Sequence, residues 1–250
     1  KSSRFEGAAT TAAPGCLETE VAPRTFQDPA PPPLVNSRCR IFQSPPGPAR
    51  LHWPVTHAPA MNAPPHPDQA QRLARAERQA AVVRALAPLL PAHALLWQPE
   101  DTIPYECDGL TAYRERPMVV ALPETEAEVA AVLKACHALD VPVVARGAGT
   151  GLSGGAMPHA LGVVLSLAKF NRILRIDPRS RTATVQAGVR NLAISEAAAP
   201  HGLYYAPDPS SQIACTIGGN VAENSGGVHC LKYGLTIHNV LQVRGFTIEG

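Results

Sequence analysis

PVVARGAGTGLSGG, residues 142–155, is the stretch from which the rest of this sequence is interpreted. An apolar run ends at Arg146, and five glycines follow within nine residues: Gly147, Gly149, Gly151, Gly154 and Gly155. Glycine permits positive φ and lets a ligand approach the backbone without meeting a Cβ. Free N–H groups along such a loop form a concave anion site, and Thr150, Ser153 and Arg146 add donors and a positive charge. The loop is therefore predicted to bind the diphosphate of a dinucleotide, with a glycine-rich surface loop as the alternative.

The chain before this loop has the pattern of a strand, a helix and a strand. Met118 to Leu122 is an apolar strand candidate. Thr125 and Glu128 form the Thr-x-x-Glu capping box of a helix, and apolar residues then recur at helical spacing. Val141 to Ala145 is the second strand, so the glycine loop follows its carboxyl end, where open α/β sheets bind ligands.

The chain after the loop is rich in strand patterns. Gly162 to Leu167 is a strand candidate, and Ile173 to Ile176 is predicted to pair with Thr182 to Ala187 as a hairpin. Asn191 to Pro200 is predicted to be a helix, and Val240 to Ile248 a strand. A β-rich half that follows a strand–helix–strand unit favours two α+β subdomains over one doubly wound sheet.

A nicotinamide-binding Rossmann unit is the principal alternative, because Gly149 to Gly154 matches G-x-G-x-x-G after a strand. That fold requires a helix to start inside the motif, whereas Gly155, Pro158 and Gly162 interrupt any helix here. The acidic residue expected about 20 positions later is also missing. A P-loop is excluded, because the sequence contains no Gly-Lys-Ser/Thr.

A second glycine-rich segment favours a different dinucleotide. Pro207 to Gly227 reads PDPSSQIACTIGGNVAENSGG, in which Asn220, Asn224 and Ser225 offer amide and hydroxyl groups. A structural loop would explain either glycine-rich segment alone, but two such loops in one domain are less expected. Two segments separated by a hairpin and a helix suit a long, two-ended ligand such as FAD.

Composition excludes several classes of protein. The 250 residues carry a formal net charge of +2, too near neutral to indicate nucleic acid or an acidic membrane surface as a partner. No apolar run is long enough for a transmembrane helix, and the nine histidines show no metal-site spacing. The six cysteines form no CxxC pair, which favours reduced thiols and a cytoplasmic location.

The first 116 residues divide into two parts. Residues 1–60 are proline-rich and lack periodicity, so we expect a disordered or non-native leader, with Met61 as the natural start. Residues 61–116 are expected to form a helix, Pro67 to Leu90, and an irregular connector. The apolar face predicted for this helix comprises Leu73, Ala76, Ala80, Val83 and Leu90, with Arg72, Arg75 and Arg78 mostly off it.

Residues 95–250 resemble a known family of flavoproteins. PVVARGAGTGLSGG, followed by AGV, PDPSSQIACTIGGNVAENSGG and KYG, is similar to the flavin domain of glycolate oxidase FAD-linked subunits. More broadly, the chain resembles FAD-binding oxidoreductases of the vanillyl-alcohol-oxidase (PCMH-type) superfamily, which include D-lactate and D-2-hydroxyglutarate dehydrogenases. The resemblance implies an α+β fold, in which residues 117–250 form a PCMH-type FAD-binding domain of two α+β subdomains, truncated at its C-terminal end.

The resemblance also implies which residues bind FAD. The first loop would wrap the diphosphate, and the second segment would line the ribityl and isoalloxazine side, with Tyr233 and Gly234 nearby. The implied residues are Arg146, Gly147, Ala148, Gly149, Thr150, Gly151, Leu152, Ser153, Pro207, Asp208, Gly218, Gly219, Asn220, Ala222, Asn224, Ser225, Gly226, Gly227, Tyr233 and Gly234. Some relatives attach the flavin to a histidine in the first loop. This loop has none, which favours non-covalent FAD, with His159, His229 and His238 as poorly supported attachment points.

By this resemblance, the chain supplies the FAD-binding half of an enzyme that oxidises a small 2-hydroxy acid, of the glycolate or D-lactate type, to the 2-oxo acid. The alternative is a non-catalytic FAD-binding or assembly subunit of a glycolate oxidase-type complex. Implied partners are the acid, an iron–sulfur subunit and a second flavin-type subunit, through which a cytoplasmic protein would associate peripherally with a membrane. The family's catalytic base and metal ligands would lie beyond Gly250, so neither is assigned, and the chain is expected to be an N-terminal fragment that is inactive alone.

Overall fold

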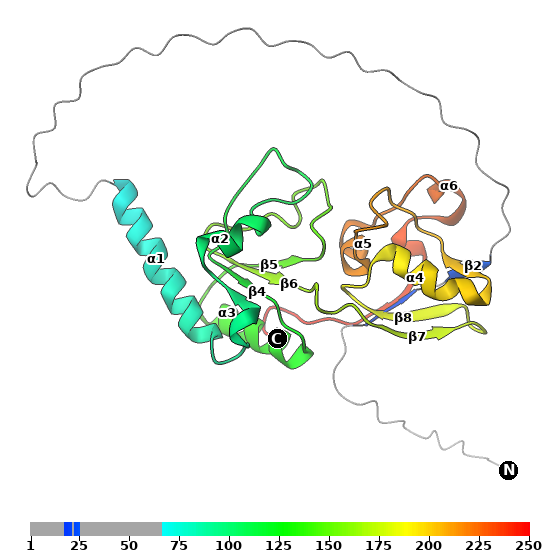
Figure 1. Ribbon diagram of the computed structural model, residues 1–250, viewed down its shortest axis with the longest axis horizontal. Coiled ribbons are helices and arrows are strands. Elements are labelled where there is room, and N and C mark those ends of the chain that lie inside the picture. Colours follow the sequence, from blue (N-terminus) through cyan, green and yellow to red (C-terminus); the bar gives the residue numbers. More distant parts are fainter. Residues whose placement is uncertain (1–17, 22, 26–66) are drawn as a thin grey trace, which may run out of the picture.

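The computed structural model describes residues 18–21, 23–25 and 67–250. The expectations for Met61, Cys16 and Cys39 lie outside these residues. The described chain forms two halves, each built around a four-stranded sheet, with the first half on the left of Figure 1 and the second on the right. Within the described residues, no helix is both long and apolar enough to cross a membrane. The cysteines in this part of the chain, Cys107, Cys136, Cys215 and Cys230, are free thiols.

The first half contains the predicted strand–helix–strand unit. Its elements are β4 (Val119–Ala121), α3 (Glu126–Ala138) and β5 (Val143–Arg146). The strand order is β3-β4-β6-β5, with β6 (Val163–Ser166) parallel to both neighbours and inserted between β4 and β5. Every residue of β4 and β6 is buried, as expected for parallel strands that are covered on both faces.

The predicted capping box at the start of α3 is confirmed. Thr125 Oγ1 accepts a hydrogen bond from the Glu128 N–H at 3.2 Å, and Glu128 Oε2 accepts one from the Thr125 N–H at 3.1 Å. The two side chains thus satisfy N–H groups that have no partner inside the helix. Val129, Val132 and Cys136 on this helix are buried against the sheet.

The first helix is shorter than predicted, and only the C-terminal part of the predicted face packs against the core. α1 spans Pro67–Leu86; Val83 packs against the core and Leu90, beyond the helix, is buried, whereas Leu73 is 55% exposed and Ala76 and Ala80 are exposed. Val82 and Leu86 are buried as well. Polar side chains replace the expected apolar ones at the contact. Arg75 donates to the carbonyls of Arg116 (2.8 Å) and Ala160 (3.1 Å), and Gln79 donates to those of Met118 (2.7 Å) and Trp97 (3.0 Å). The carbonyls beside the sheet need donors, so an arginine predicted to lie off the face is part of the contact.

The connector between α1 and β4 is more regular than the sequence predicted. It contains β3 (Leu95–Leu96), which pairs antiparallel with β4, and the short helix α2 (Pro99–Thr102). A two-residue strand is too short to show an alternating pattern. The backbone partner that β4 offers therefore defines it, rather than its own sequence.

The second half contains the predicted hairpin and helix. β7 (Ile173–Asp177) pairs antiparallel with β8 (Thr182–Gln186), and α4 (Asn191–Ala198) leads to β9 (Leu203–Tyr205). The Asp177 carboxylate accepts from the N–H groups of the turn, as predicted for this Asp-Pro sequence. β10 is shorter than predicted, Val240–Val243, because the residues after it leave the sheet.

Two strands come from the stretch expected to be a leader without regular structure. β1 (Glu18–Val21) lies between β10 and β8, antiparallel to both, and gives the order β10-β1-β8-β7. β2 (Pro23–Thr25) pairs with β9. The prediction of no ordered element before Met61 is therefore wrong for these residues. Segments this short carry little local signal, and the strands beside them supply the backbone partners.

Candidate functional site

The two glycine-rich segments line one cavity of about 590 Å³, called the polar cavity below because it is the more polar of two cavities in the described part of the chain. The first loop contributes Gly147 to Ser153, with Gly155 and Ala156. The second segment contributes residues between Pro209 and Gly226, among them Gly219, Asn220, Ala222 and Ser225. Segments that are well separated in sequence thus form a single site, as the FAD hypothesis requires.

Part of the second glycine-rich segment is a helix, which was not predicted from the sequence. α5 spans Ile217–Glu223, and Thr216 is its N-cap residue. The cavity-lining residues Thr216, Asn220 and Glu223 therefore follow one another at helical spacing along one side of α5. The helix directs a hydroxyl, an amide and a carboxylate toward the first loop.

Two buried polar atoms on the cavity wall have no hydrogen-bond partner among the described residues. They are Thr216 Oγ1 and Asn220 Nδ2, on side chains whose residues are 6% and 1% exposed. Buried polar groups are nearly always paired, since an unpaired group costs about 1–3 kcal/mol. Partners supplied by a polar ligand would remove this cost, so the residues present fit a ligand with several hydrogen-bonding groups, such as FAD.

Close approach of the two segments requires glycine in the first loop. A Cβ at Gly147 would collide with the Thr216 hydroxyl, and Gly149 has φ of 68°, in the left-handed region. A Cβ at Gly149 would collide with the Arg146 guanidinium. The glycines thus allow the loop to reach α5 and keep its backbone open to a ligand.

Arg146, predicted to supply a positive charge to the diphosphate, makes its contacts outside the polar cavity. Arg146 Nη1 donates to the Cys107 carbonyl at 2.9 Å and the Ala156 carbonyl at 3.4 Å, and the guanidinium lies 5.6 Å from the centre of the Tyr105 ring. Arg146 is not among the residues that line the polar cavity. Its observed contacts hold the loop to the connector, so a direct contact with the diphosphate remains a prediction.

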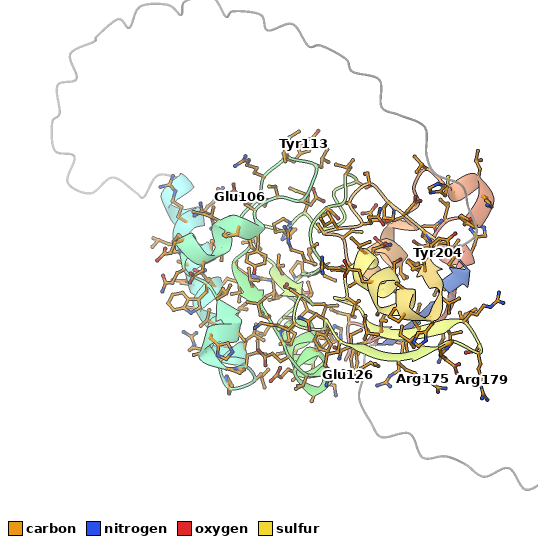
Figure 2. The ribbon with its side chains drawn as sticks, turned by 45° about the vertical axis from the view of Figure 1, so that its right-hand side comes forward. Glu106, Tyr113, Glu126, Arg175, Arg179 and Tyr204 are labelled. Carbon is orange, nitrogen blue, oxygen red and sulfur yellow. The ribbon has the colours of Figure 1, made fainter. Side chains whose placement is uncertain are left out.

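Several other predicted residues form a group beside the polar cavity. Asp208 Oδ2 lies 2.5 Å from His229 Nδ1, and a Cβ at Gly227 would collide with the Asp208 carbonyl. The Tyr233 ring stands edge-on to that of Tyr204, with centroids 6.0 Å apart; Figure 2 labels Tyr204 in the second half. The predicted residues outside the cavity lining are Arg146, Pro207, Asp208, Gly218, Asn224, Gly227, Tyr233 and Gly234.

Among the cavity residues that sequence reasoning missed, Thr216 and Glu223 carry polar side chains at the two ends of α5. Both stand beside predicted residues. A test for helical spacing from Thr216 would have found them, because Asn220 is four residues after Thr216 and Glu223 seven after it. Cavity residues Pro209, Ser210, Ser211 and Cys215 were also not predicted.

A second, mostly apolar cavity of about 330 Å³ adjoins the polar one. Ala145 lines both cavities, and adjacent residues of α5, Gly218 and Gly219, line one each. The apolar walls come from the first half (Val129, Leu133, Val143, Leu165, Leu167) and from Ala187, Val221 and residues 243–248. Arg244 at this cavity pairs with Glu126 Oε2 at 2.8 Å and so joins the two halves; Figure 2 labels Glu126 on α3.

The strongest pKa shifts belong to core residues outside the polar cavity. Burial raises the pKa of the Cys136 thiol to about 11 and that of the Tyr205 phenol to about 12. In the described part of the chain, no cluster of three or more His, Cys, Asp or Glu side chains could hold a metal ion.

Comparison with known proteins agrees with this site. A family model described as an FAD binding domain matches residues 117–250. The glycolate oxidase subunit GlcD of Escherichia coli K12 is 63% identical over 169 residues, which cover 68% of this chain and 34% of that protein. A D-lactate dehydrogenase of Archaeoglobus fulgidus is 42% identical over 132 residues, 53% of this chain and 29% of that protein. The chain thus spans only about a third of these relatives.

Solved structures agree on the fold. An alkyldihydroxyacetonephosphate synthase shares 22% identity with a TM-score of 0.58, over 66% of this chain and 35% of that one. p-Cresol methylhydroxylase shares 22% identity with a TM-score of 0.52, over 60% of this chain and 30% of that one. The α+β fold and the choice of FAD over a nicotinamide nucleotide are confirmed. The chain belongs to the FAD binding domain family, whose model matches residues 117–250.

Proposed function

We propose that this chain is the FAD-binding part of an enzyme that oxidises a small 2-hydroxy acid to the 2-oxo acid. The observation that carries the proposal is the pair of unpartnered buried atoms, Thr216 Oγ1 and Asn220 Nδ2, facing a loop of close-approach glycines. The relatives' names support the substrate class, because glycolate, D-lactate and D-2-hydroxyglutarate are all 2-hydroxy acids. When bound, the flavin accepts a hydride from the α-carbon of such an acid.

The two cavities suggest how FAD lies. The diphosphate fits the polar cavity, where Thr150, Ser153 and Thr216 offer hydroxyls beside the loop N–H groups. The adenine fits the adjoining apolar cavity, since its flat ring needs apolar walls. The isoalloxazine then lies toward Asp208, Gly227 and Tyr233, the side that the sequence assigned to it. The FAD contacts of the residues predicted from the sequence are part of this proposal.

FAD binding is tested by titrating the 250-residue chain with FAD and following the quenching of flavin fluorescence. We expect saturable, non-covalent binding of FAD, and none of NAD. ADP should compete, because it carries the adenine and the diphosphate. A chain that binds NAD and leaves FAD free would overturn the proposal.

Thr216→Val separates ligand binding from structural support. Valine keeps the shape but removes a hydroxyl that has no partner in the described protein, so we expect unchanged or higher stability and about tenfold weaker FAD binding. Thr236→Val is the matched control. The Thr236 hydroxyl donates to the Ser225 carbonyl at 2.7 Å, so its loss should lower the unfolding temperature. A Thr216→Val protein that binds FAD normally would contradict the role of this hydroxyl.

The place of the adenine is tested by filling the apolar cavity. Val221→Trp should weaken FAD and ADP together, whereas Val221→Ile, which adds one methylene, should change both little. Equal ADP affinity of the tryptophan variant and the wild type would contradict the proposal that the adenine lies in this cavity.

The substrate class is tested by adding glycolate, D-lactate or D-2-hydroxyglutarate to the FAD-saturated full-length protein. Bleaching of the visible flavin absorption by one acid identifies the substrate. FAD binding by the full-length protein without bleaching by any acid favours the non-catalytic subunit. The proposed iron–sulfur and second flavin-type partners, and cytoplasmic or peripheral membrane location, are tested by affinity purification from a native source followed by cell fractionation.

A further inference from the structure

The polar cavity has an unusual charge for a diphosphate site. Glu223 is the only charged side chain among the residues that line it. The nearest predicted cation, Arg146, binds the carbonyls of Cys107 and Ala156 instead. Figure 2 shows Arg175 and Arg179 on the β7–β8 hairpin at the outer edge of the molecule, so they do not compensate this charge. A bound diphosphate would therefore meet a carboxylate and no facing cation.

The Glu223 carboxylate lies directly against the first glycine loop. Its Oε2 accepts a hydrogen bond from Ser153 Oγ at 3.0 Å. Its Oε1 lies where a Cβ on Gly151 would be 2.8 Å away, and one on Gly155 3.0 Å away. The carboxylate thus faces both ends of the 151–155 turn. No larger residue could stand at either glycine without displacing this carboxylate.

The fold explains how an acidic side chain reaches this loop. Glu223 is the last residue of α5 and follows Thr216 and Asn220 along the side of the helix that lines the cavity. The loop approaches that side closely because Gly147 has no Cβ to collide with Thr216. The close packing that forms the cavity therefore also brings Glu223 to the loop.

We propose that the exposed Glu223 carboxylate lies where the cofactor's diphosphate binds against the first glycine loop and must release Ser153 when FAD enters. This inference rests on the proposed function. Carboxylate and phosphate oxygens are both anionic acceptors, so they compete for the same donors and repel each other. Glu223 thereby weakens the binding of negatively charged ligands at this site. Its carboxylate stays against the loop until the cofactor binds.

Glu223→Gln tests this role, because the amide keeps a polar contact with Ser153 but removes the charge. We expect the dissociation constant of FAD to fall about tenfold, while that of riboflavin, which has no phosphate, stays unchanged. The inhibition constant of inorganic pyrophosphate, corrected for the FAD affinity of each protein, should also fall in the variant. Adding salt should reduce the difference between wild type and variant, because exposed charges are screened.

Two further variants complete the experiment. Glu77→Gln removes an exposed glutamate on α1 and so matches the change in net charge; we expect wild-type affinity for FAD. Glu223→Ala should show the same gain as Glu223→Gln and provides a second test if the glutamine variant does not fold. FAD affinity equal in wild type and both Glu223 variants would overturn this inference and leave the proposed function intact. FAD binding by none of the proteins would overturn both.

Discussion

The two halves of the molecule differ in how far apart in the sequence the strands of their sheets lie. In the first half, β3, β4, β6 and β5 all come from residues 95–166. In the second half, β1 stands between β10 and β8 although it comes from residues 18–21. The first sheet therefore forms from contiguous chain, whereas the second requires the closure of a long loop, which costs entropy.

The strands of the two halves also differ in how deeply they are buried. β4 and β6 are buried throughout, whereas in β10 Leu241 is 61% exposed and Val243 57% exposed. The interior strand β1 also lies outside residues 117–250, which the FAD-binding family model matches. The comparison teaches that the first sheet forms from strands close together in sequence, whereas the second sheet includes a strand from far upstream.

The largest expected effect comes from a charge in the first sheet. Val164→Asp places a carboxylate at a fully buried position of β6 and should destabilise the protein by more than about 4 kcal/mol. Leu241→Asp in exposed β10 should change the free energy of unfolding by less than about 0.5 kcal/mol. Urea unfolding followed by circular dichroism measures both. Similar losses in the two variants would remove the proposed contrast.

The next effect tests whether β1 supports the second half alone. Glu20→Pro removes a backbone N–H from a strand paired on both sides and should cost roughly 3 kcal/mol locally. Amide hydrogen exchange should accelerate at Thr184 and Gln242, which are paired with Glu20, and stay slow in β4 and β6. Unchanged exchange at Thr184 and Gln242 would show that β1 does not hold this sheet.

A smaller effect, which depends on pH, comes from the ionisation of Tyr205 in the core of the second half. Burial raises the pKa of Tyr205 from 10.0 to about 12, so the folded protein favours the neutral phenol. This stabilisation is complete well below pH 10 and is lost as the pH rises through 12, up to about 3 kcal/mol. Tyr205→Phe should show a correspondingly flatter stability curve over this range. Parallel curves for the two proteins would assign the alkaline loss to other groups, such as Cys136.

The smallest effect lies at the start of α3. Thr125→Ala removes the side-chain half of the capping box and should destabilise the first half by about 1 kcal/mol. Thr125→Ser keeps the hydroxyl and should be nearly neutral. Denaturant midpoints of the three proteins provide the comparison, and a neutral alanine variant would show that the cap contributes little here.

Features that depend on neighbouring residues could be predicted from the sequence. The Thr125–Glu128 box, the Asp177 turn and the glycine loop each follow from groups that are at most a few residues apart. The same local pattern excluded a Rossmann helix after Gly155 and identified the FAD-binding family. The sequence also singled out both glycine-rich segments that line the polar cavity.

Features that depend on distant partners could not be read in this way. Arg75 contacts carbonyls 41 and 85 residues away, and Arg146 contacts one 39 residues away, so each guanidinium serves a role that its own surroundings do not indicate. Glu223 meets Ser153, 70 residues earlier, only because α5 packs against the loop. The sequence by itself determined the local elements and the family of this protein. The tertiary structure decided which donors and charges meet, because hydrogen bonds and charge pairs depend on distance in space and not on separation along the chain.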